Sequence, residues 1–321
     1  MTTDSTPEHE LSTGARPTGA TDEHTAAENV REMFDAIAPT YDRANHVLTF
    51  GLDRWLWNRT ARAFRKTLQR PEAVVLDLCC GTGDMTLALY QHRPKVPCEK
   101  GLVRTKVKSE TNRAEKKFES DKSVVWEKAE SEEKIVILSE ASRSFIARGE
   151  VEGPAVASSA PAIAPILALD FSHRMLTLGA KKFAGLNILA IEADALHLPL
   201  ADNSIDLVTI AYGFRNLASY EDGLAELHRV LHPGGQIGIL ECNRPEGLTG
   251  AAYNLYFKKI LPRIGGIISG DRAAYTYLPA SVERFPRPPR MLQLIQQAGF
   301  TQATWTRYTC GAAGLYCATK P

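Results

Sequence analysis

The feature that most constrains the fold is the stretch "AVVLDLCCGTGD" at residues 73–84, an apolar run that ends in two closely spaced glycines. An unbroken apolar run is typical of a strand that is buried on both faces of a parallel sheet. Because Gly81 and Gly83 carry no Cβ, the backbone of the turn can approach a ligand closely. The stretch therefore predicts a buried strand that leads into a binding turn for a nucleotide or a nucleoside.

The chain beyond this turn alternates between apolar strands and amphipathic helices. Further strands are expected at 165–170, 187–194, 204–213 and 236–243. Helices are expected at 85–91, at 172–184 and from 220 to the stop at Pro233-Gly234-Gly235, with Leu231 on the apolar face of the last one. This alternation predicts an α/β fold in which helices cover both faces of a parallel sheet. Strands at 301–310 and 314–320 are separated by a short link, so we expect a C-terminal antiparallel hairpin that completes a mostly parallel seven-stranded sheet.

Two segments lie outside this pattern. Residues 1–27 are polar and predict a disordered tail. About 70 residues separate the first helix from the next strand, where an ordinary connection needs a handful. Within them, 23 of the 53 residues at 98–150 are charged. We interpret about 94–161 as a charged surface insertion in a single domain that spans 28–321.

Composition excludes several classes of protein. The chain is 44% hydrophobic with a net charge of +1, which is typical of a globular protein and gives no electrostatic basis for nucleic-acid binding. The N-terminus has no signal-peptide pattern, and no run approaches the roughly 20 apolar residues of a membrane span, so we expect a cytoplasmic protein. The six cysteines lack zinc spacing, so no metal site is expected.

The glycine turn discriminates between cofactors. The dinucleotide pattern G-x-G-x-x-G needs a third glycine, and this chain has Thr86 there. Asp84 stands in the turn, where its carboxylate would repel a phosphate. The spacing Asp77-x-x-x-Gly81-x-Gly83 therefore favours S-adenosylmethionine, which carries a sulfonium and no phosphate, over NAD.

Polar residues also follow three other expected strands, at the edge where ligands bind in open α/β sheets. Asp170 is placed to accept hydrogen bonds from both ribose hydroxyls, and Asp194 with the Ala195 backbone to meet the adenine. Arg215 and Asn216 follow the fourth strand and would face the reacting methyl group. The alternative for Arg215 is a structural role, as an anchor of the next helix.

Taken together, these motifs resemble those of a known family. In order, "VLDLCCGTGD", "ALDFSHRML", "ADALHLPLADNSIDLVTIAYGFRN" and "LHRVLHPGGQIGILE" resemble the class I S-adenosylmethionine-dependent methyltransferases, which have a Rossmann-like fold. The segments at 33–57 and 256–286, together with "GFRN", are similar to the signatures of the quinone C-methyltransferases of ubiquinone and menaquinone biosynthesis. The resemblance covers nearly everything outside the tail and the insertion.

The resemblance implies the cofactor, its contacts and the reaction. S-adenosylmethionine would contact Thr82 of the glycine turn, Asp170, Asp194 and Ala195, and Ala211 stands where family members often carry a serine. The implied reaction is C-methylation of a prenylated quinol ring. We favour demethylmenaquinol as the acceptor, and the equivalent ubiquinol precursor, or both, is the alternative.

The chemistry of this reaction suggests roles for particular residues. The nucleophile is a ring carbon beside a phenolic hydroxyl, so a base or a cation that stabilises phenolate is expected. Arg215 is the candidate cation, with Asn216 beside it. Tyr41 and Asp42 of "YDRAN" are candidates for positioning or proton transfer from an N-terminal lid.

The acceptor's apolar tail suggests contact with a membrane. The segment at 253–270 mixes aromatic and aliphatic residues with Lys258, Lys259 and Arg263, a pattern that suits peripheral contact with the inner face of the membrane.

Other classes of function remain open from the sequence. A small-molecule O- or N-methyltransferase would share the cofactor motifs. A non-catalytic scaffold of quinone biosynthesis that binds S-adenosylmethionine is a further alternative, as is association into an oligomer or a biosynthetic complex.

Overall fold

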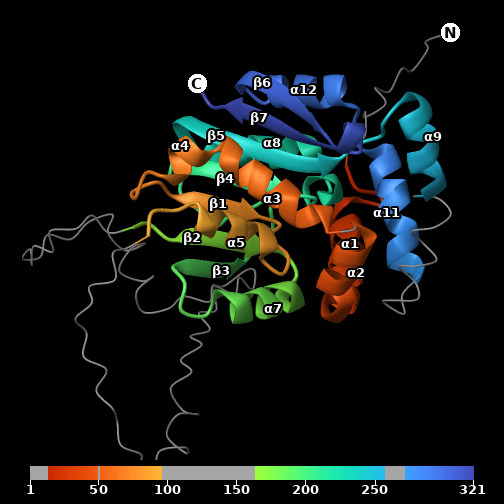
Figure 1. The fold of residues 1–321 in the computed structure, drawn as a ribbon, viewed down its shortest axis with the longest axis horizontal. Helices are drawn as coiled ribbons and strands as arrows, with labels where there is room; N and C mark the ends of the chain where they lie inside the picture. Colours follow the sequence, from red (N-terminus) through yellow and green to blue (C-terminus); the bar gives the residue numbers. More distant parts are fainter. Residues whose placement is uncertain (1–13, 50, 96–162, 257–271) are drawn as a thin grey trace, which may run out of the picture.

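A seven-stranded sheet forms the centre of the molecule (Figure 1). The computed structural model describes residues 14–49, 51–95, 163–256 and 272–321. The strands are β1 (Val75–Leu78), β2 (Ile166–Asp170), β3 (Ile188–Glu192), β4 (Ile205–Ala211), β5 (Leu231–Cys242), β6 (Thr301–Tyr308) and β7 (Ala313–Thr319). Their order across the sheet is β3-β2-β1-β4-β5-β7-β6.

The directions of the strands confirm the expected topology. The first five strands pair in parallel, and β7 runs antiparallel to both β5 and β6. The expected hairpin therefore joins the sheet through its second strand, which lies between β5 and β6. The chain moves from β1 to β3 on one side and then crosses to β4 on the other side of β1, so the topological switch point lies between β1 and β4.

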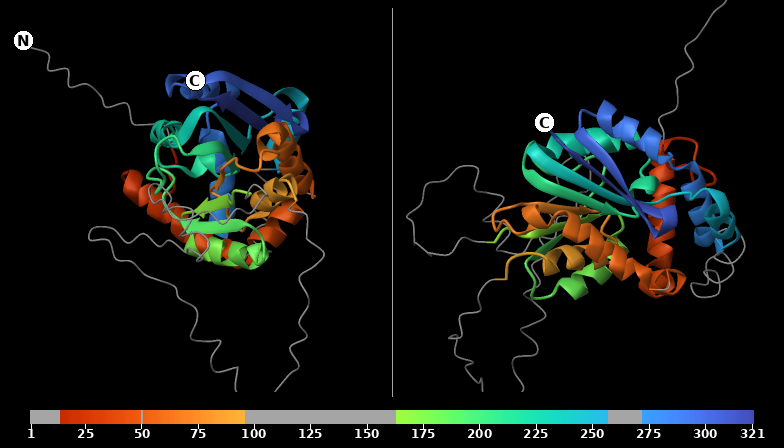
Figure 2. Two further views of the ribbon diagram at one scale, coloured as in Figure 1. Left: turned by 90° about the vertical axis from the view of Figure 1, so that its left-hand side faces the viewer. Right: turned by 45° about the horizontal axis from the view of Figure 1, so that its top comes forward.

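Helices cover both faces of the sheet, as Figure 2 shows from two further directions. The remaining elements are α1 (Glu23–Ile37), η1 (Ala38–Thr40), α2 (Tyr41–Leu48), α3 (Leu52–Ala63), α4 (Arg65–Leu68), α5 (Asp84–Gln91), α7 (His173–Phe183), η2 (Phe214–Asn216), α8 (Tyr220–Val230), α9 (Gly247–Leu255), α11 (Arg272–Arg284), α12 (Pro288–Gln297) and η4 (Thr309–Gly311). Apolar residues of α3, α4, α5 and α7 form one core with the sheet, and those of α8 and α12 form another.

The strands have apolar residues on both faces because both are covered. In β1, Val75 belongs to one core and Leu76 to the other. All four residues of this strand are buried, as the unbroken apolar run predicted. One boundary was wrong: the helix expected to include Leu231 and to stop at Pro233 ends at Val230, and Leu231 already pairs with Ile205 in the sheet.

The N-terminal segment corrects a prediction. Disorder was expected through residue 27, yet α1 begins at Glu23 and is capped by the Asp22 carboxylate, which accepts a hydrogen bond from the Thr25 amide at 2.8 Å. Further upstream, the Ala15 amide donates to the Leu217 carbonyl at 2.8 Å. The segment is ordered because a capping box starts its helix and its apolar residues pack against the rest of the fold.

Nearly all of the proposed insertion at 94–161 lies outside the described residues, but both of its flanks are described. The buried Arg93 guanidinium donates to the carbonyls of Arg70, Pro71 and Ala164 at 2.9, 2.9 and 2.8 Å. Ala164 follows the segment and leads directly into β2, so one side chain bridges its two flanks. These flanks lie at the amino ends of the strands.

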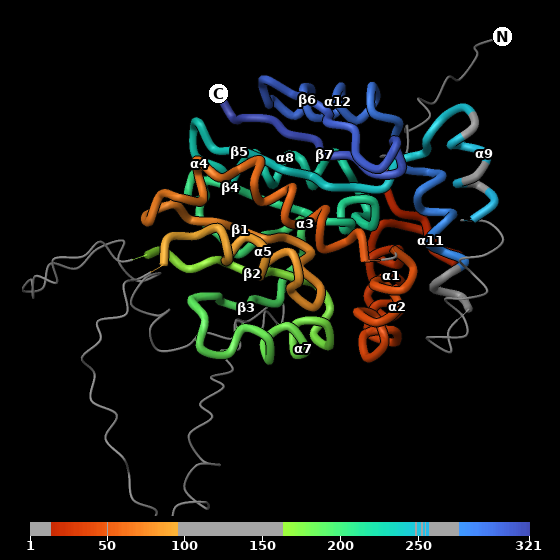
Figure 3. Tube along the Cα trace, in the orientation of Figure 1, coloured from red at the N-terminus to blue at the C-terminus, as the bar shows by residue number. Residues whose placement is uncertain are grey.

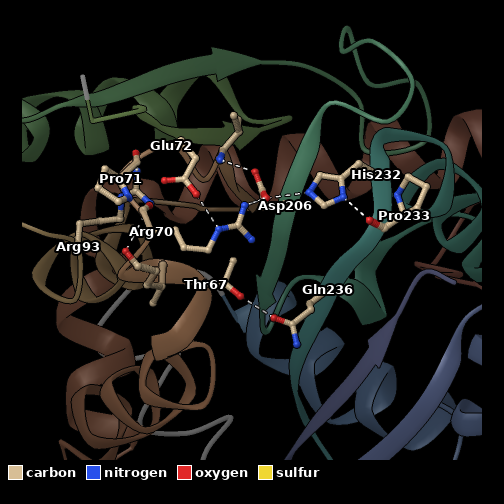
Figure 4. A network of polar contacts seen from close by, with 11 residues as sticks. Thr67, Arg70, Pro71, Glu72, Arg93, Asp206, His232, Pro233 and Gln236 are labelled. Carbon is tan, nitrogen blue, oxygen red and sulfur yellow. Dashed lines mark hydrogen bonds and ion pairs between the residues drawn. The ribbon is translucent and has the colours of Figure 1, made fainter. Parts of the chain in front are cut away.

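The same edge of the sheet carries a polar network, which Figure 4 shows. The Asp206 carboxylate accepts hydrogen bonds from Arg70 at 2.6 Å, from the Val74 amide at 2.8 Å and from His232 Nε2 at 2.7 Å. Arg70 also pairs with Glu72 at 3.0 Å. The network joins the segment before β1 to the starts of β4 and β5, which makes this edge structural.

Within the part of the chain that the structure describes, no helix is both long enough and apolar enough to cross a membrane.

Candidate active site

A cleft of about 800 Å3, open to solvent, lies at the carboxyl ends of the strands, beside the switch point between β1 and β4. The path of the chain around it can be followed in Figure 3. Its walls come from the ends of β1, β2, β3 and β4 and from α1 and α2. Of the residues expected at the site, those that line the cleft are Tyr41, Gly81, Asp170, Asp194, Ala195, Ala211 and Asn216.

The glycine turn and Asp170 form the floor of the cleft. Gly81 has a left-handed conformation (φ 56°), and its amide donates to Asp170 Oδ2 at 2.8 Å. A Cβ at Gly81 would meet only Tyr41, at 3.9 Å, so the space in front of this backbone is open. Asp170 Oδ1 accepts a second hydrogen bond, from the Ser172 amide at 2.9 Å.

Burial makes Asp170 sensitive to pH. Desolvation raises the pKa of this carboxyl to about 6, although hydrogen bonds from the amides of Ser172 and Gly81 act in the opposite direction. Each carboxylate oxygen accepts one backbone hydrogen bond and keeps a second lone pair, so Asp170 can still accept from a pair of hydroxyls.

Asp194 and Ala195 line the cleft just after β3. Asp194 Oδ1 accepts from the Leu196 amide at 2.9 Å, and Oδ2 lies 3.1 Å from His197 Nδ1. These contacts fix the loop, while the Asp194 side chain stays 39% exposed and open to a ligand.

Asp77 and Gly83 lie outside the cleft lining, contrary to the expected direct contacts with a cofactor. Asp77 is 0% exposed, and its carboxylate accepts hydrogen bonds from the hydroxyls of Thr86 at 2.6 Å and Thr209 at 2.9 Å. Because Asp77 lies inside strand β1, its side chain points into the core, where its hydrogen bond to Thr86 supports the glycine turn. Gly83 starts α5 at φ 86°, where a Cβ would lie 2.1 Å from the Phe183 ring.

Thr82 and Asp42 form a latch, together with Lys182 of α7. The Thr82 hydroxyl donates to Asp42 Oδ1 and is 3.3 Å from Lys182 Nζ. Lys182 Nζ also binds Asp42 at 2.7 Å and Asp84 at 2.8 Å. The latch joins α2 to the glycine turn, and it engages the side chains that were expected to meet the cofactor (Thr82) or the acceptor (Asp42).

Helix α1 forms a wall of the cleft that sequence reasoning missed. Its residues in the lining are Ala27, Val30, Arg31 and Phe34. Arg31 pairs with Glu192 at 3.1 Å, and its guanidinium lies 5.0 Å from the centre of the Phe171 ring. The Ser172 hydroxyl donates to Asp35 at 2.5 Å. The capping pattern at 22–25 and the apolar spacing that follows it were the available signals.

Arg215 lies behind the cleft in a buried ion pair. Its Nη1 is 2.6 Å from Glu241 Oε1, and the two side chains are 8% and 0% exposed. Burial disfavours the charged guanidinium, but the Glu241 carboxylate raises the pKa of Arg215 above its ordinary value. Arg215 is therefore a fixed cation that is largely neutralised by Glu241, which the sequence did not identify as its partner.

Two phenols line the cleft in front of Arg215. Burial raises the pKa values of both Tyr41 and Tyr212, so each is a hydrogen-bond donor at neutral pH rather than a base. Tyr212 has φ 61°, and Cys79 on the neighbouring strand has φ 55°. Strained backbone of this kind clusters at functional sites, and here it marks the switch point. Asn216 accepts from the Tyr277 hydroxyl at 3.2 Å.

The cleft fits a nucleoside. The half-buried Asp170 carboxylate, with free lone pairs, lies beside the bare Gly81 backbone, which suits a ribose. The residues that would hold S-adenosylmethionine are Gly81, Asp170, Asp194 and Ala195.

Comparisons with solved structures support the fold. A SAM-dependent methyltransferase from Thermotoga maritima matches with a TM-score of 0.51 at 14% identity, covering 91% of this chain and all of that one. The [4+2]-cyclase SpnF matches with a TM-score of 0.53 at 14% identity, covering 97% and 99%. At such identities the likeness shows a class I methyltransferase fold and does not specify the reaction.

Comparisons with curated sequences are more specific. A demethylmenaquinone methyltransferase from Deinococcus radiodurans is 36% identical over 93% of this chain and 95% of that protein. One from Thermus thermophilus is 33% identical over 90% of this chain and its own full length. A ubiquinone/menaquinone biosynthesis C-methyltransferase from Campylobacter jejuni is 30% identical over 91% and 98%. The model of the ubiE/COQ5 methyltransferase family matches residues 21–132 and 146–320, and the chain therefore belongs to this family.

Proposed function

We propose that this protein transfers a methyl group from S-adenosylmethionine to a ring carbon of demethylmenaquinol. The observation that carries the proposal is the cleft, where the half-buried Asp170 and the Gly81 backbone face a wall of apolar and aromatic side chains. Membership of the family and the names of the relatives from Deinococcus and Thermus support this acceptor.

Different residues of the cleft bind the methyl donor and the acceptor. Asp170 and the Gly81 backbone orient the ribose, and Asp194 with Ala195 orients the adenine. When bound, S-adenosylmethionine supplies a methyl group that is already electrophilic. Helix α1 and Tyr41 form a wall of the cleft, and with both substrates bound this wall would limit the access of water to the aligned reacting atoms.

Arg215 and the cleft phenols act on the acceptor. The positive charge of Arg215, reduced by Glu241, favours phenolate at the acceptor's hydroxyl. Tyr41 and Tyr212 donate hydrogen bonds to the acceptor oxygen. Asp42 is held by Lys182 and Thr82, so its role is to fasten α2 rather than to take a proton.

The apolar tail of the acceptor dissolves in a membrane, so we also propose that the enzyme works at the inner face of the membrane as a peripheral protein. The expected contacts of Lys258, Lys259 and Arg263 lie outside the described residues.

The test is a transfer of labelled methyl from S-adenosylmethionine to demethylmenaquinol and to the demethylated ubiquinol precursor, side by side. Mass spectrometry of the product locates the label. We expect label on the ring carbon of menaquinol. Label on the ubiquinol product alone would change the acceptor, and label on oxygen or nitrogen would overturn C-methylation. A protein that binds the cofactor and labels neither would fit the scaffold alternative.

A further inference from the structure

Helix α3 has one face in the core and one face in solvent. Leu56, Thr60 and Ala61 are buried, whereas Trp55, Arg59 and Arg62 recur at intervals of four and three residues on the exposed side. This exposed side continues into α4 with Arg65 and Lys66. We call it the α3 surface and define it by its exposed residues: Leu52, Arg54, Trp55, Arg59, Arg62, Arg65 and Lys66.

Large apolar side chains are exposed at one end of the α3 surface. Leu52 and Trp55 are each 48% exposed, and Val47, at the end of α2, is 52% exposed. Leu255 of α9 is 54% exposed, and the hydroxyl of its neighbour Tyr256 donates to the Leu48 carbonyl at 2.7 Å. This hydrogen bond brings the end of α9 against the end of α2, so the exposed apolar side chains gather in one region.

The cations of the α3 surface have no acidic partners in the part of the chain that the structure describes. Within residues 14–49, 51–95, 163–256 and 272–321, no carboxylate lies within 4.0 Å of Arg54, Arg59, Arg62, Arg65 or Lys66. Asp53 is the one acidic residue in α3 and α4; it is buried and lies 3.4 Å from His46. A net charge of about +4 is therefore concentrated here, in a chain whose total is +1.

Trp55 is held by neighbours that leave one side of its ring in solvent. The Arg59 guanidinium lies 5.2 Å from the Trp55 ring centre and 4.9 Å from that of Tyr308. The Trp55 and Tyr308 rings meet edge to face, with their centres 6.1 Å apart. A half-exposed Trp flanked by arginines is the arrangement that favours a lipid headgroup layer, where its apolar ring and its N–H are both satisfied.

We propose that the α3 surface docks the protein onto a bilayer that carries anionic phospholipid. The cations of this surface, which have no carboxylate partner among the described residues, match the negative surface potential of such a bilayer. Leu52 and Trp55, together with Val47 of α2, enter the boundary between headgroups and acyl chains. Helix α2 connects this surface to the cleft, since Tyr41 lines the cleft and Val47 lies at its exposed end. This surface would make the membrane contact proposed above, on which the inference rests, but the docking does not depend on which acceptor is methylated.

Vesicle co-sedimentation tests the docking with the full chain and without any quinol. We expect binding to vesicles of phosphatidylcholine with 30% phosphatidylglycerol, weak binding to pure phosphatidylcholine, and a loss of binding at high salt. The variant R62Q/R65Q/K66Q should bind the anionic vesicles about 100-fold more weakly. The matched control, K181Q/R287Q/R290Q, removes the same charge from exposed positions on α7 and α12 and beside α12, and should bind as the wild type does.

Tryptophan emission tests the apolar part of the surface. We expect a blue shift of the emission when anionic vesicles are added, and W55F should lose it while keeping most of the binding. Circular dichroism and thermal unfolding check that each variant is folded. Equal binding by the two triple variants, no binding by the wild type, or an unshifted emission spectrum would overturn the proposal, as would a stable dimer that R62Q/R65Q/K66Q dissociates.

Two substrates separate this inference from the proposed function. With a short-tailed, water-soluble demethylmenaquinol, R62Q/R65Q/K66Q should turn over at the wild-type rate. With a long-tailed quinol in anionic vesicles, it should lose activity in proportion to its lost binding. Vesicle binding without methyl transfer would overturn the proposed function and leave the docking surface intact. If R62Q/R65Q/K66Q instead methylates the long-tailed quinol in vesicles at the wild-type rate, the docking surface is overturned and the proposed function stands.

Discussion

Glu241 holds the guanidinium of Arg215 at 2.6 Å in a pair that is almost wholly buried. The same carboxylate accepts from the amides of Arg215 at 3.2 Å and Cys242 at 2.8 Å. The end of β5 thereby fixes the segment that follows β4, and with it Tyr212 and Asn216 in the cleft wall.

The variant Glu241→Gln should therefore lose about 3 kcal/mol of stability, because a buried cation loses its countercharge. The double variant Arg215→Met/Glu241→Gln should recover most of this stability, since no buried charge remains. If Arg215 stabilises phenolate, the double variant should stay impaired in turnover by about 100-fold while it binds the cofactor normally. Urea unfolding and single-turnover methyl transfer measure the two effects, and full turnover by the double variant would refute the role of Arg215.

Cofactor affinity should depend on the protonation of Asp170. Burial raises the pKa of this carboxyl to about 6, and its ionised form accepts the ribose hydroxyls. Affinity should therefore be constant above pH 6 and fall about tenfold per pH unit below it. Asp170→Asn should bind roughly 10- to 100-fold more weakly at pH 7.5, with little pH dependence. Calorimetry with S-adenosylhomocysteine between pH 5 and 8 tests this, and Asp194→Asn is the control that should keep the inflection near pH 6.

The latch of Lys182 should keep α2 closed over the glycine turn. Lys182→Gln removes a cation that binds both Asp42 and Asp84, so amide exchange in α2 should become about fivefold faster. The neighbouring Lys181 is exposed, and Lys181→Gln is the matched control that should leave exchange unchanged. Hydrogen exchange with mass spectrometry measures both, and identical profiles for the two variants would show that the latch does not restrain α2.

The network in Figure 4 should make stability depend on pH through His232. Its Nε2 faces Asp206 and its Nδ1 faces the Pro233 carbonyl, both acceptors, so the site favours the protonated ring, and the Asp206 hydrogen bond raises the pKa of His232. A raised pKa means that the stabilisation is complete below the unfolded value near 6.5 and is lost as the pH rises through the folded value.

From pH 6 to pH 8, the wild type should lose about 0.5 to 1 kcal/mol more than His232→Gln, after allowance for the partial exposure of the ring. Urea titrations at the two pH values measure the difference. His24→Gln, at an exposed site, should behave as the wild type does. A wild-type profile that matches that of His232→Gln would rule out this pH dependence.

Most of the strands were predictable because they are apolar runs bounded by turn residues, whereas their order across the sheet comes from the structure. Asp170 and Asp194 were expected at the site because they follow such runs, and both line the cleft. Asp77 was also expected there, but it lies inside strand β1, fully buried, and does not line the cleft. The capping box at the start of α1 was visible in the sequence, but the contact of this helix with distant residues, such as that of Arg31 with Glu192, was not.

The partner of Arg215 could not be predicted for a similar reason. Glu241 lies 26 residues further along the chain and meets Arg215 only because β4 and β5 are neighbours. A sequence identifies a polar residue at the end of a strand, but whether that residue faces a ligand or a countercharge depends on the tertiary contact.

Replacement of residues 96–162 by a short Gly/Ser linker should leave methyl transfer within about twofold of the wild type, since loop length has little effect on stability. Thermal unfolding and the labelled-methyl assay check the variant. Arg93→Met in the full chain should be the more harmful change, because it removes the hydrogen bonds of the buried guanidinium to the carbonyls of Leu68, Arg70, Pro71 and Ala164. Loss of activity in the shortened protein alone would support a functional segment or a scaffold.

The clasp of Arg93 on Ala164 has a consequence for how this fold accommodates change. The Arg93 guanidinium fixes the distance between the two flanks. The start of β2 is therefore held in place independently of the length of the chain that follows Lys95. The clasp also lies at the opposite edge of the sheet from the cleft. Insertions or deletions between the two flanks should therefore not reach the cleft. The Arg93 hydrogen bonds hold the flanks in place, and the full length of the strands lies between the flanks and the cleft.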